Sequence, residues 1–513
     1  MGAVIAALAA GCAVVAAFLS GDAARTDRPD PEVAMVAAAL VLAALLAFGK
    51  SRWVRISALV VAAGATGWAS YCLSTDLGSG TPGNSTGVLT VAAVISVAAT
   101  GLTVRGDRAR PLRWWLALPL VVVLAAGTVA AAMTVPSLAV RSVTTAAVVA
   151  PALADRVKGT PWKWTSPTEV RDVVAAGAGV AVAGPDGDIT ALDGPTGAVR
   201  WTYARPGAHL RALVATPDLH LLLAVYGGDG RDHLTVLDAF TGVPLQETLI
   251  DEVRGANLLA PTATVLPSSV YLGNDNFRVD ALDLRTGSRR WTWTAPEGCV
   301  SPFALPASGR DVVLAPLLCP DRLSVLGLDE RTGTPRWEHR LPVTRPSDEK
   351  ADFYLHSSPD GETVSLALRY PGLATGNGTD VVLAAATGAI VSTMDPRAPK
   401  QITLGPVAVS ERDENGKTTA STVDGGIAVD LAACPVRLAH STTPTAYLRL
   451  CALSGGRLVA HRQELDGSPA STLPIDWPPG TPYTGFARPS LIPAPGALVA
   501  ARGGAPVIGY PAR

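Results

Sequence analysis

One short motif recurs at nearly constant spacing and constrains the fold of this chain more than any other feature. Four copies have the pattern Leu-Asp-x-x-Thr-Gly, and their glycines stand 45, 45 and 46 residues apart. Three of the copies also carry a Trp four residues after the glycine. The motif residues are Asp193, Gly197 and Trp201, then Asp238 and Gly242, then Asp283, Gly287 and Trp291, and finally Asp329, Gly333 and Trp337.

Each copy is typical of a β-hairpin. The Asp at the end of the first strand can accept hydrogen bonds from free N–H groups of the turn, and the Gly supplies the positive φ that a tight turn requires. A repeat of ~45 residues provides the four strands of one propeller blade. A weaker copy ends at Gly388, and another is expected at Gly455-Gly456. The 365 residues from Val149 to Arg513 predict an all-β propeller of eight blades, with seven as the alternative because the later repeats are longer.

The ends of the repeat region indicate how the ring closes. The stretch 162–165, Trp-Lys-Trp-Thr, resembles 291–294, the outer strand of a repeat, yet no repeat precedes it. The last strands of the chain, 497–502 and 506–510, lack an outer strand of their own. Pairing the first of these strands with the last would remove the free sheet edges, so we predict this closure.

The first quarter of the chain predicts a membrane domain. A helix needs roughly 20 apolar residues to cross the ~30 Å hydrocarbon layer. Five stretches meet or approach this length without any Asp, Glu, Lys, Arg or His: 2–20, 33–49, 56–73, 87–104 and 114–135. A cleaved signal peptide is the competing interpretation of the first stretch, but that stretch lacks a basic start.

Loop charges predict the orientation of these helices, because Lys and Arg are retained on the cytoplasmic side. Loop 50–55 and loop 105–113 are basic, whereas loop 74–86 has no Lys or Arg. The predicted topology is a multi-pass plasma-membrane protein with a cytoplasmic N-terminus. We expect the membrane domain over 1–135, a juxtamembrane linker over 136–160, and an extracytoplasmic propeller over 161–513.

Composition and missing motifs exclude several functions. The net charge is -1 and no block of basic residues is present, so the electrostatic footprint of a nucleic-acid-binding protein is missing. The seven histidines show no metal-ligand spacing, and the sequence contains neither a haem-attachment motif nor a Gly-x-Ser-x-Gly nucleophile elbow. No catalytic, cofactor-binding or metal-binding residue is predicted.

The extended string Leu-Asp-x-x-Thr-Gly-x-x-x-Trp resembles the repeat of quinoprotein-type propellers, the PQQ-like repeat superfamily. The resemblance covers the chain from about Trp162 onward and is strongest between residues 178 and 340. The group includes eight-bladed PQQ-dependent dehydrogenases and also binding propellers such as the outer-membrane β-barrel assembly lipoprotein. Within the family the motif is architectural, and its Trp packs between blades.

The resemblance leaves two functions open. Many alcohol-oxidising members hold PQQ beside a disulfide between adjacent cysteines, and no two cysteines are adjacent here. The acidic calcium ligands and the catalytic Asp of such enzymes are not assignable either. We therefore favour a non-catalytic binding or scaffold propeller without a cofactor, which contacts membrane lipid and binds an envelope protein or a small ligand on one face. The alternative is a membrane-bound PQQ-dependent dehydrogenase of alcohols or sugars, because sugar dehydrogenases of this kind also place five N-terminal helices before the propeller.

Four cysteines lie in the part predicted to be extracytoplasmic, where thiols are oxidised. We predict that Cys299 pairs with Cys319 and Cys434 with Cys451, since each pair is local in sequence. A zinc site is the rival interpretation, but the spacing fits no zinc motif.

Overall fold

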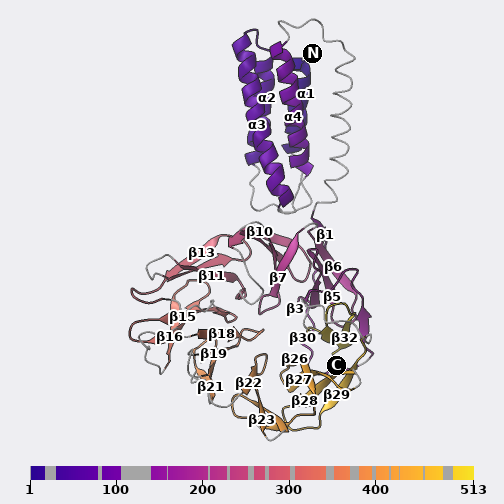
Figure 1. Ribbon diagram of the computed structural model, residues 1–513, viewed down its shortest axis with the longest axis vertical. Helices are drawn as coiled ribbons and strands as arrows, with labels where there is room; N and C mark the ends of the chain where they lie inside the picture. Colours follow the sequence, from indigo (N-terminus) through magenta and orange to yellow (C-terminus); the bar gives the residue numbers. More distant parts are fainter. Residues whose placement is uncertain are drawn as a thin grey trace.

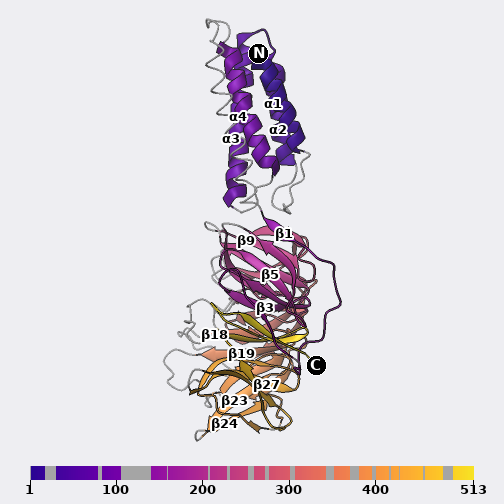
Figure 2. The ribbon, with the colours of Figure 1, turned by 90° about the vertical axis from the view of Figure 1, so that its right-hand side faces the viewer.

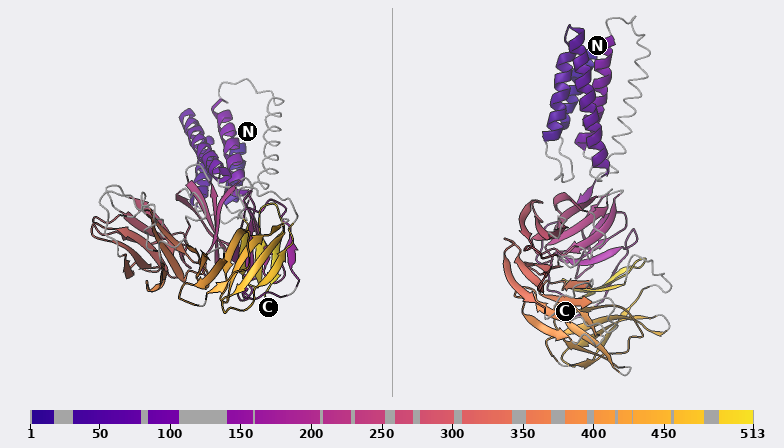
Figure 3. Two further views of the ribbon diagram at one scale, coloured as in Figure 1. Left: turned by 60° about the horizontal axis from the view of Figure 1, so that its bottom comes forward. Right: turned by 60° about the vertical axis from the view of Figure 1, so that its left-hand side comes forward.

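Helices form the N-terminal part of the chain and strands form the rest, with the change between residues 105 and 140. Figures 1 and 3 show a helix bundle beside a ring of sheets. The computed structural model describes residues 2–17, 31–78, 84–105, 140–158, 160–205, 208–227, 231–251, 259–271, 277–300, 307–341, 352–369, 380–394, 400–414, 417–426, 428–454, 457–477 and 489–512.

Four helices coincide with the first four predicted apolar stretches. They are α1 (Gly2–Ala17), α2 (Pro31–Ala47), α3 (Arg52–Gly78) and α4 (Asn84–Arg105). Among the described residues, only Arg52–Ser74 of α3 is both long and apolar enough to cross a membrane, because the apolar parts of the other three helices fall short of ~20 residues. The prediction of five spanning helices is therefore not supported, and its fifth segment, 114–135, lies outside the described residues.

The helix bundle is packed through small side chains. Alanines make up most of the buried positions, among them Ala13, Ala65, Ala69 and Ala93. Apart from a few buried ones such as Leu40 and Leu89, many large apolar side chains point outward, and those of Leu8, Leu45 and Val60 are each about two-thirds exposed (68%, 66% and 65%). Most water-soluble bundles bury their large apolar residues, so this distribution is inverted.

Eight sheets follow the helices, and each is one blade. The first four blades contain β3 (Asp172–Ala176), β4 (Gly179–Ala183), β5 (Asp188–Asp193) and β6 (Val199–Ala204); β7 (His209–Ala215), β8 (Leu221–Gly227), β9 (Arg231–Asp238) and β10 (Pro244–Asp251); β11 (Val265–Tyr271), β12 (Phe277–Asp283) and β13 (Arg289–Thr294); and β14 (Ala307–Ser308), β15 (Val312–Leu318), β16 (Leu323–Asp329) and β17 (Pro335–Arg340).

Blades 5 to 8 complete the ring. They contain β18 (Asp352–Ser357), β19 (Thr363–Arg369), β20 (Asp380–Ala384) and β21 (Ile390–Met394); β22 (Lys400–Thr403), β23 (Val409–Glu414), β24 (Lys417–Thr422) and β25 (Val429–Asp430); β26 (Val436–Thr442), β27 (Ala446–Ala452), β28 (Leu458–Glu464) and β29 (Ser471–Ile475); and β30 (Ser490–Ala494), β31 (Ala497–Ala501), β32 (Val507–Pro511) and β2 (Trp162–Trp164). The eight-bladed prediction is thus confirmed and the seven-bladed alternative is wrong.

The ring closes as predicted. The early strand β2 pairs antiparallel with the last strand β32, in the register Trp162 opposite Gly509 and Trp164 opposite Val507. Blade 8 therefore takes its outer strand from the start of the propeller and its three inner strands from the end of the chain. This arrangement joins both ends of the ring by main-chain hydrogen bonds.

The stretch that precedes β2 also belongs to the propeller. Strand β1 (Arg141–Val143) adds a fifth strand to blade 1 by pairing with β6. Farther along, the N–H of Ala154 donates to the carbonyl of Ala494 in blade 8 at 3.0 Å. The linker predicted over 136–160 therefore needs correction: residues 140–158, which we call the strap, are bound to the ring, because their main chain hydrogen-bonds to three blades.

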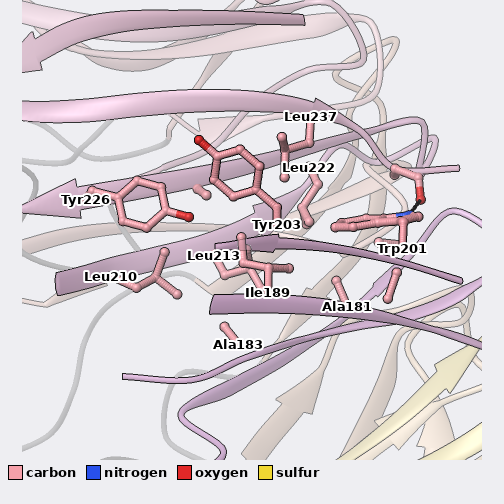
Figure 4. Close-up of a cluster of buried hydrophobic side chains, with 14 of the residues drawn as sticks. Ala181, Ala183, Ile189, Trp201, Tyr203, Leu210, Leu213, Leu222, Tyr226 and Leu237 are labelled. Carbon is pink, nitrogen blue, oxygen red and sulfur yellow. Dashed lines mark hydrogen bonds between the residues drawn. The ribbon is translucent and has the colours of Figure 1, made fainter. Parts of the chain in front are cut away.

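The hydrophobic core lies between the sheets. Figure 4 shows Ile189 and Tyr203 of blade 1 against Leu210, Leu222 and Tyr226 of blade 2, all at most 1% exposed. The second strand of a blade is covered on both faces, so β4 and β31 are buried throughout. This explains why those strands are uninterrupted apolar runs in the sequence.

Candidate binding surface

The antiparallel blades sort all connections onto two faces of the ring. The first strands of neighbouring blades adjoin one another around the axis, and each sheet then proceeds outward. Turns between first and second strands, and between third and fourth strands, lie on one face, which we call the hairpin face. The other connections lie on the opposite face, which we call the loop face. Four long connections, 295–306, 341–351, 370–379 and 476–489, belong to the loop face.

The repeat motif builds the hairpin face. The Asp329 carboxylate accepts hydrogen bonds from the N–H groups of Arg331 and Thr332, both at 2.9 Å, and pairs with the Arg336 guanidinium at 2.7 Å. Burial raises the pKa of Asp329, but the hydrogen bonds from Arg336 and from the backbone outweigh it and lower the pKa to about 2. The equivalent turns of the other copies use Asp193, Asp238 and Asp283 in the same way.

The motif Trp seals the boundary between blades. The indole N–H of Trp201 donates to the carbonyl of Ala239 in blade 2 at 3.0 Å, and that of Trp291 donates to Glu330 in blade 4 at 2.8 Å. A Cβ added to Gly242 would lie 2.7 Å from the Trp201 ring. Where a Trp of the preceding blade lies against the turn, the glycine is thus favoured both by its positive φ and by the lack of room for a Cβ beside the indole.

The contact between a Trp and the hairpin turn of the next blade, which we call the Trp seam, occurs at four blade boundaries among the described residues. Trp162 donates to Gly194 at 2.7 Å and Trp337 to Ala385 at 3.2 Å, so the seam also joins blades 8 and 1 and blades 4 and 5. Trp201 and Trp291 are buried, at 1% and 9% exposure, while Trp337 is half-buried. Between blades 2 and 3 the buried Gln246 takes the place of the Trp and lies against Gly287. The motif residues are therefore distributed around the ring and form no common site.

Both predicted disulfides are present, and both lie on the loop face. Cys299 bonds Cys319 in blade 4, and Cys434 bonds Cys451 in blade 7. In each pair one cysteine precedes the first strand of the blade and the other stands at the end of its second strand. The two disulfides thus perform the same role in two blades: each fixes an incoming loop-face connection.

A polar cluster lies at the inner boundary of blades 6 and 7. The hydroxyl of Tyr447 donates to the Glu411 carboxylate at 2.6 Å, and Arg437 pairs with the same carboxylate at 2.7 Å. Thr403 and His440 are 2.7 Å apart through Oγ1 and Nδ1. The Cys434–Cys451 disulfide joins the two strands that carry Arg437, His440 and Tyr447.

Burial dominates the electrostatics of this cluster. It raises the pKa of the Tyr447 hydroxyl, and the hydrogen bond to Glu411 adds to that effect. Burial also lowers the pKa of His440, as does the nearby Arg437, against a smaller opposing effect of Glu411. The Arg437 side chain is 30% exposed. Arg437 is therefore partly exposed to solvent while its guanidinium is paired with Glu411.

A second buried ion pair lies between blades 1 and 2, and neither of its side chains is exposed to solvent. Arg205 pairs with Glu247 at 2.5 Å, and both side chains are at most 2% exposed. The Tyr203 hydroxyl donates to Glu247 at 3.0 Å, and the Arg205 guanidinium lies 5.0 Å from the centre of the Tyr226 ring. This network is a buried core element that orients the two blades, although Nε and Nη1 of Arg205 have no hydrogen-bond partner among the described residues.

Two features that alcohol-oxidising PQQ enzymes use are not seen among the described residues. The disulfides join cysteines 20 and 17 residues apart, so neither is the adjacent-cysteine clamp of the alcohol-oxidising members. Over the described part of the chain, no group of three or more His, Cys, Asp or Glu side chains comes together in a way that could hold a calcium ion.

Comparisons with known proteins agree with the repeat. Residues 141–298 and 185–353 match a family model described as outer membrane protein assembly factor BamB. Similar solved structures include BamB from Moraxella catarrhalis (16% identity, 68% of this chain and 99% of that one, TM-score 0.41) and Sqt1 from Saccharomyces cerevisiae (11% identity, 71% and 100%, TM-score 0.40). A third is dihydro-heme d1 dehydrogenase NirN (13% identity, 60% and 67%, TM-score 0.37). No curated protein matches the chain.

Proposed function

This chain belongs to the PQQ-like β-propeller repeat family, and we propose that it is a membrane-anchored, extracytoplasmic scaffold whose loop face binds a protein of the cell envelope. The single observation that carries the proposal is the position of the two disulfides. Both stabilise loop-face connections, in blades 4 and 7, and neither lies near the repeat turns of the hairpin face.

The disulfides support the compartment and the face together. Structural disulfides persist outside the cytoplasm and are rare within it. Each contributes about 3 kcal/mol in the chain-entropy picture, because it closes a loop of 20 or 17 residues. Strand pairing already closes the ring, so the two disulfides chiefly stabilise the connections where they lie, on the loop face. Their shared position supports a loop face that must hold its shape.

The inverted packing of the helices supports anchoring in lipid. Small residues at helix contacts and large apolar residues outside are what a bilayer favours, because lipid supplies no hydrophobic force between helices. Exposed apolar side chains such as Leu8, Leu42 and Leu45 would be unfavourable in water. We propose that α1 to α4, together with the apolar stretch 114–135, form the multi-pass anchor.

A protein is the partner class that the comparisons favour. The matching family model describes an assembly factor for outer membrane proteins, and this chain shares its repeat over residues 141–353. The oriented Arg437 in blade 7 would pair with a carboxylate of such a partner. Blades 4 and 7, which carry the disulfides, would frame the contact.

Site-specific crosslinking on intact cells tests the face. A photo-reactive residue is placed at Asp321, whose side chain is 70% exposed on the loop face of blade 4. The matched control is placed at Arg331, exposed on the hairpin face of the same blade. We expect one discrete protein adduct from Asp321, weakened by Arg437→Ala, and none from Arg331. Adducts from Arg331 alone, or from neither position, would contradict a loop-face scaffold.

A further inference from the structure

The strap carries an uncharged, exposed run across the hairpin face. No residue between Arg141 and Asp155 is charged. Strand β1 pairs with β6 of blade 1, and beyond it the N–H of Thr145 donates to the carbonyl of Thr241 in blade 2 at 3.0 Å. The Arg200 guanidinium donates to the carbonyl of Ala146 at 3.1 Å. The strap is therefore held in place, yet Val149 is 93% exposed.

Exposed apolar side chains of the propeller gather at this rim. Eight large ones occur among the described residues of the ring: Val143, Val148, Val149, Leu153, Val199, Val243, Ile390 and Val436. The first four lie in the strap, and Val199 and Val243 follow the hairpin turns of blades 1 and 2 that the strap crosses. We call Val143, Val148, Val149, Val199 and Val243 the rim patch. Singly exposed valines need no explanation, but the clustering of five of these eight side chains in the rim patch does.

The chain itself brings this patch close to the bilayer. The last apolar stretch ends at Val135, and the strap is described from Val140, five residues later. Five residues span at most ~18 Å when fully extended, and the headgroup layer takes up ~5–7 Å of that distance. Figures 1 and 2 likewise place β1 on the side of the ring nearest the helices.

We infer that the rim patch rests on the surface of the lipid bilayer in which the helices are anchored. The inference depends on the proposed membrane anchoring and adds an orientation to it. A tethered surface needs little affinity of its own, because the short connection holds it at high effective concentration. Uncharged valines lose water at the interface, and the exposed Arg141 at the start of the strap can face headgroup phosphates.

The contact would orient the whole ring. Blades 1 and 2 would abut the membrane, and blades 5 and 6, on the opposite side of the ring, would point away from it. The loop face would then stand open to the side, where a neighbouring envelope protein can reach it. A second copy or another protein could cover the same valines, and the experiment separates these occupants.

The test uses the full chain in vesicles of phosphatidylcholine and phosphatidylglycerol. Cys12 and Cys72, the cysteines outside the disulfides, are replaced by Ala. A fluorophore is attached in separate proteins at Val149→Cys in the rim patch, at Leu42→Cys on the outside of α2, and at Arg331→Cys on blade 4. Spin labels on headgroups or shallow acyl positions report lipid contact, and aqueous iodide reports exposure to water.

We expect lipid spin labels to quench the Leu42 and Val149 probes and to leave the Arg331 probe bright. Iodide should quench Arg331 several-fold more than Val149. An unquenched Leu42 probe would refute the anchoring. Quenching at Leu42 with a Val149 probe open to iodide would overturn the membrane contact alone. A Val149 probe shielded from both quenchers would also overturn it, in favour of a protein covering the rim.

Discussion

Replacing Gly242 by Ala should expose how strongly the Trp seam stabilises the ring. Gly242 has φ +75°, and a Cβ there would lie 2.7 Å from the Trp201 ring. Gly467 has φ +84° in the outer hairpin of blade 7, but its Cβ would meet nothing within 4 Å. Gly467→Ala therefore carries the same backbone strain without the steric conflict and serves as the matched control.

The two substitutions should differ by several kcal/mol in the free energy of unfolding. A left-handed backbone costs a non-glycine residue ~1–2 kcal/mol, which is the whole effect expected at Gly467. In Gly242→Ala the Trp201 indole must also move away from residue 242, and complete loss of a buried Trp costs ~3–5 kcal/mol. We expect a destabilisation of ~3–5 kcal/mol for Gly242→Ala and a similar one for Trp201→Ala.

A double substitution isolates the contact. When Trp201→Ala has removed the indole, adding Gly242→Ala should lower the free energy of unfolding only by the backbone strain of ~1–2 kcal/mol. The effects of the two changes should therefore be less than additive. The measurement is equilibrium guanidinium unfolding of the detergent-solubilised chain, followed by circular dichroism of the strands. Equal losses for Gly242→Ala and Gly467→Ala, or full additivity with Trp201→Ala, would refute the seam.

Three further predictions concern the disulfides, acid stability and catalysis. Replacing Cys434 and Cys451 by Ser should cost ~3 kcal/mol of stability and leave Cys299 and Cys319 resistant to alkylation without reductant, whereas four reactive thiols in the unaltered chain would contradict both bonds. The pKa of Asp329 is lowered to about 2 in the folded state. Its contribution to the free energy of unfolding, under about 1 kcal/mol for a surface pair, should be present above pH ~4 and disappear as the pH falls through about 2. Asp329→Asn should therefore flatten that part of the curve of unfolding free energy against pH. Incubation with PQQ and calcium should give no dye reduction with alcohols or aldoses, and saturable turnover would establish the dehydrogenase alternative.

Local sequence signals were enough for the parts of the fold that repeat. The Thr-Gly turns with their positive φ, the eight blades and the β2–β32 closure all follow from the spacing of glycines and tryptophans. The cysteine pairs followed from their proximity in sequence. The outer hairpins of blades 6 and 7 were missed, because they turn at Gly425 and Gly467, while Gly455-Gly456 lies outside the described residues. These turns lack the Thr-Gly pair, although Asp424-Gly425 and Asp466-Gly467 are turn signals in their own right.

Local sequence signals did not predict the long-range contacts. Nothing near residue 150 indicates that the strap crosses to blades 7 and 8, where Asp155 accepts a hydrogen bond from Thr445 at 2.9 Å. The Glu411, Arg437 and Tyr447 cluster joins three strands of two blades, and no local pattern marks its members. The packing of whole sheets determines which buried polar residues meet, so the spacing of residues in the sequence does not predict these contacts.

The way the boundaries are sealed explains why the repeat fades along the chain. The Trp seam joins blades 8, 1 and 2 and blades 3, 4 and 5, and in blade 5 its position is taken by Ser392, opposite Val382. Beyond that point other contacts join the blades: the Glu411 and Tyr447 hydrogen bond between blades 6 and 7, and Trp477 under Arg502, 4.7 Å from its guanidinium, between blades 7 and 8. Each of these lies away from the hairpin turns, so the turns of blades 6 and 7 no longer have to accommodate an indole and their sequence is free to diverge.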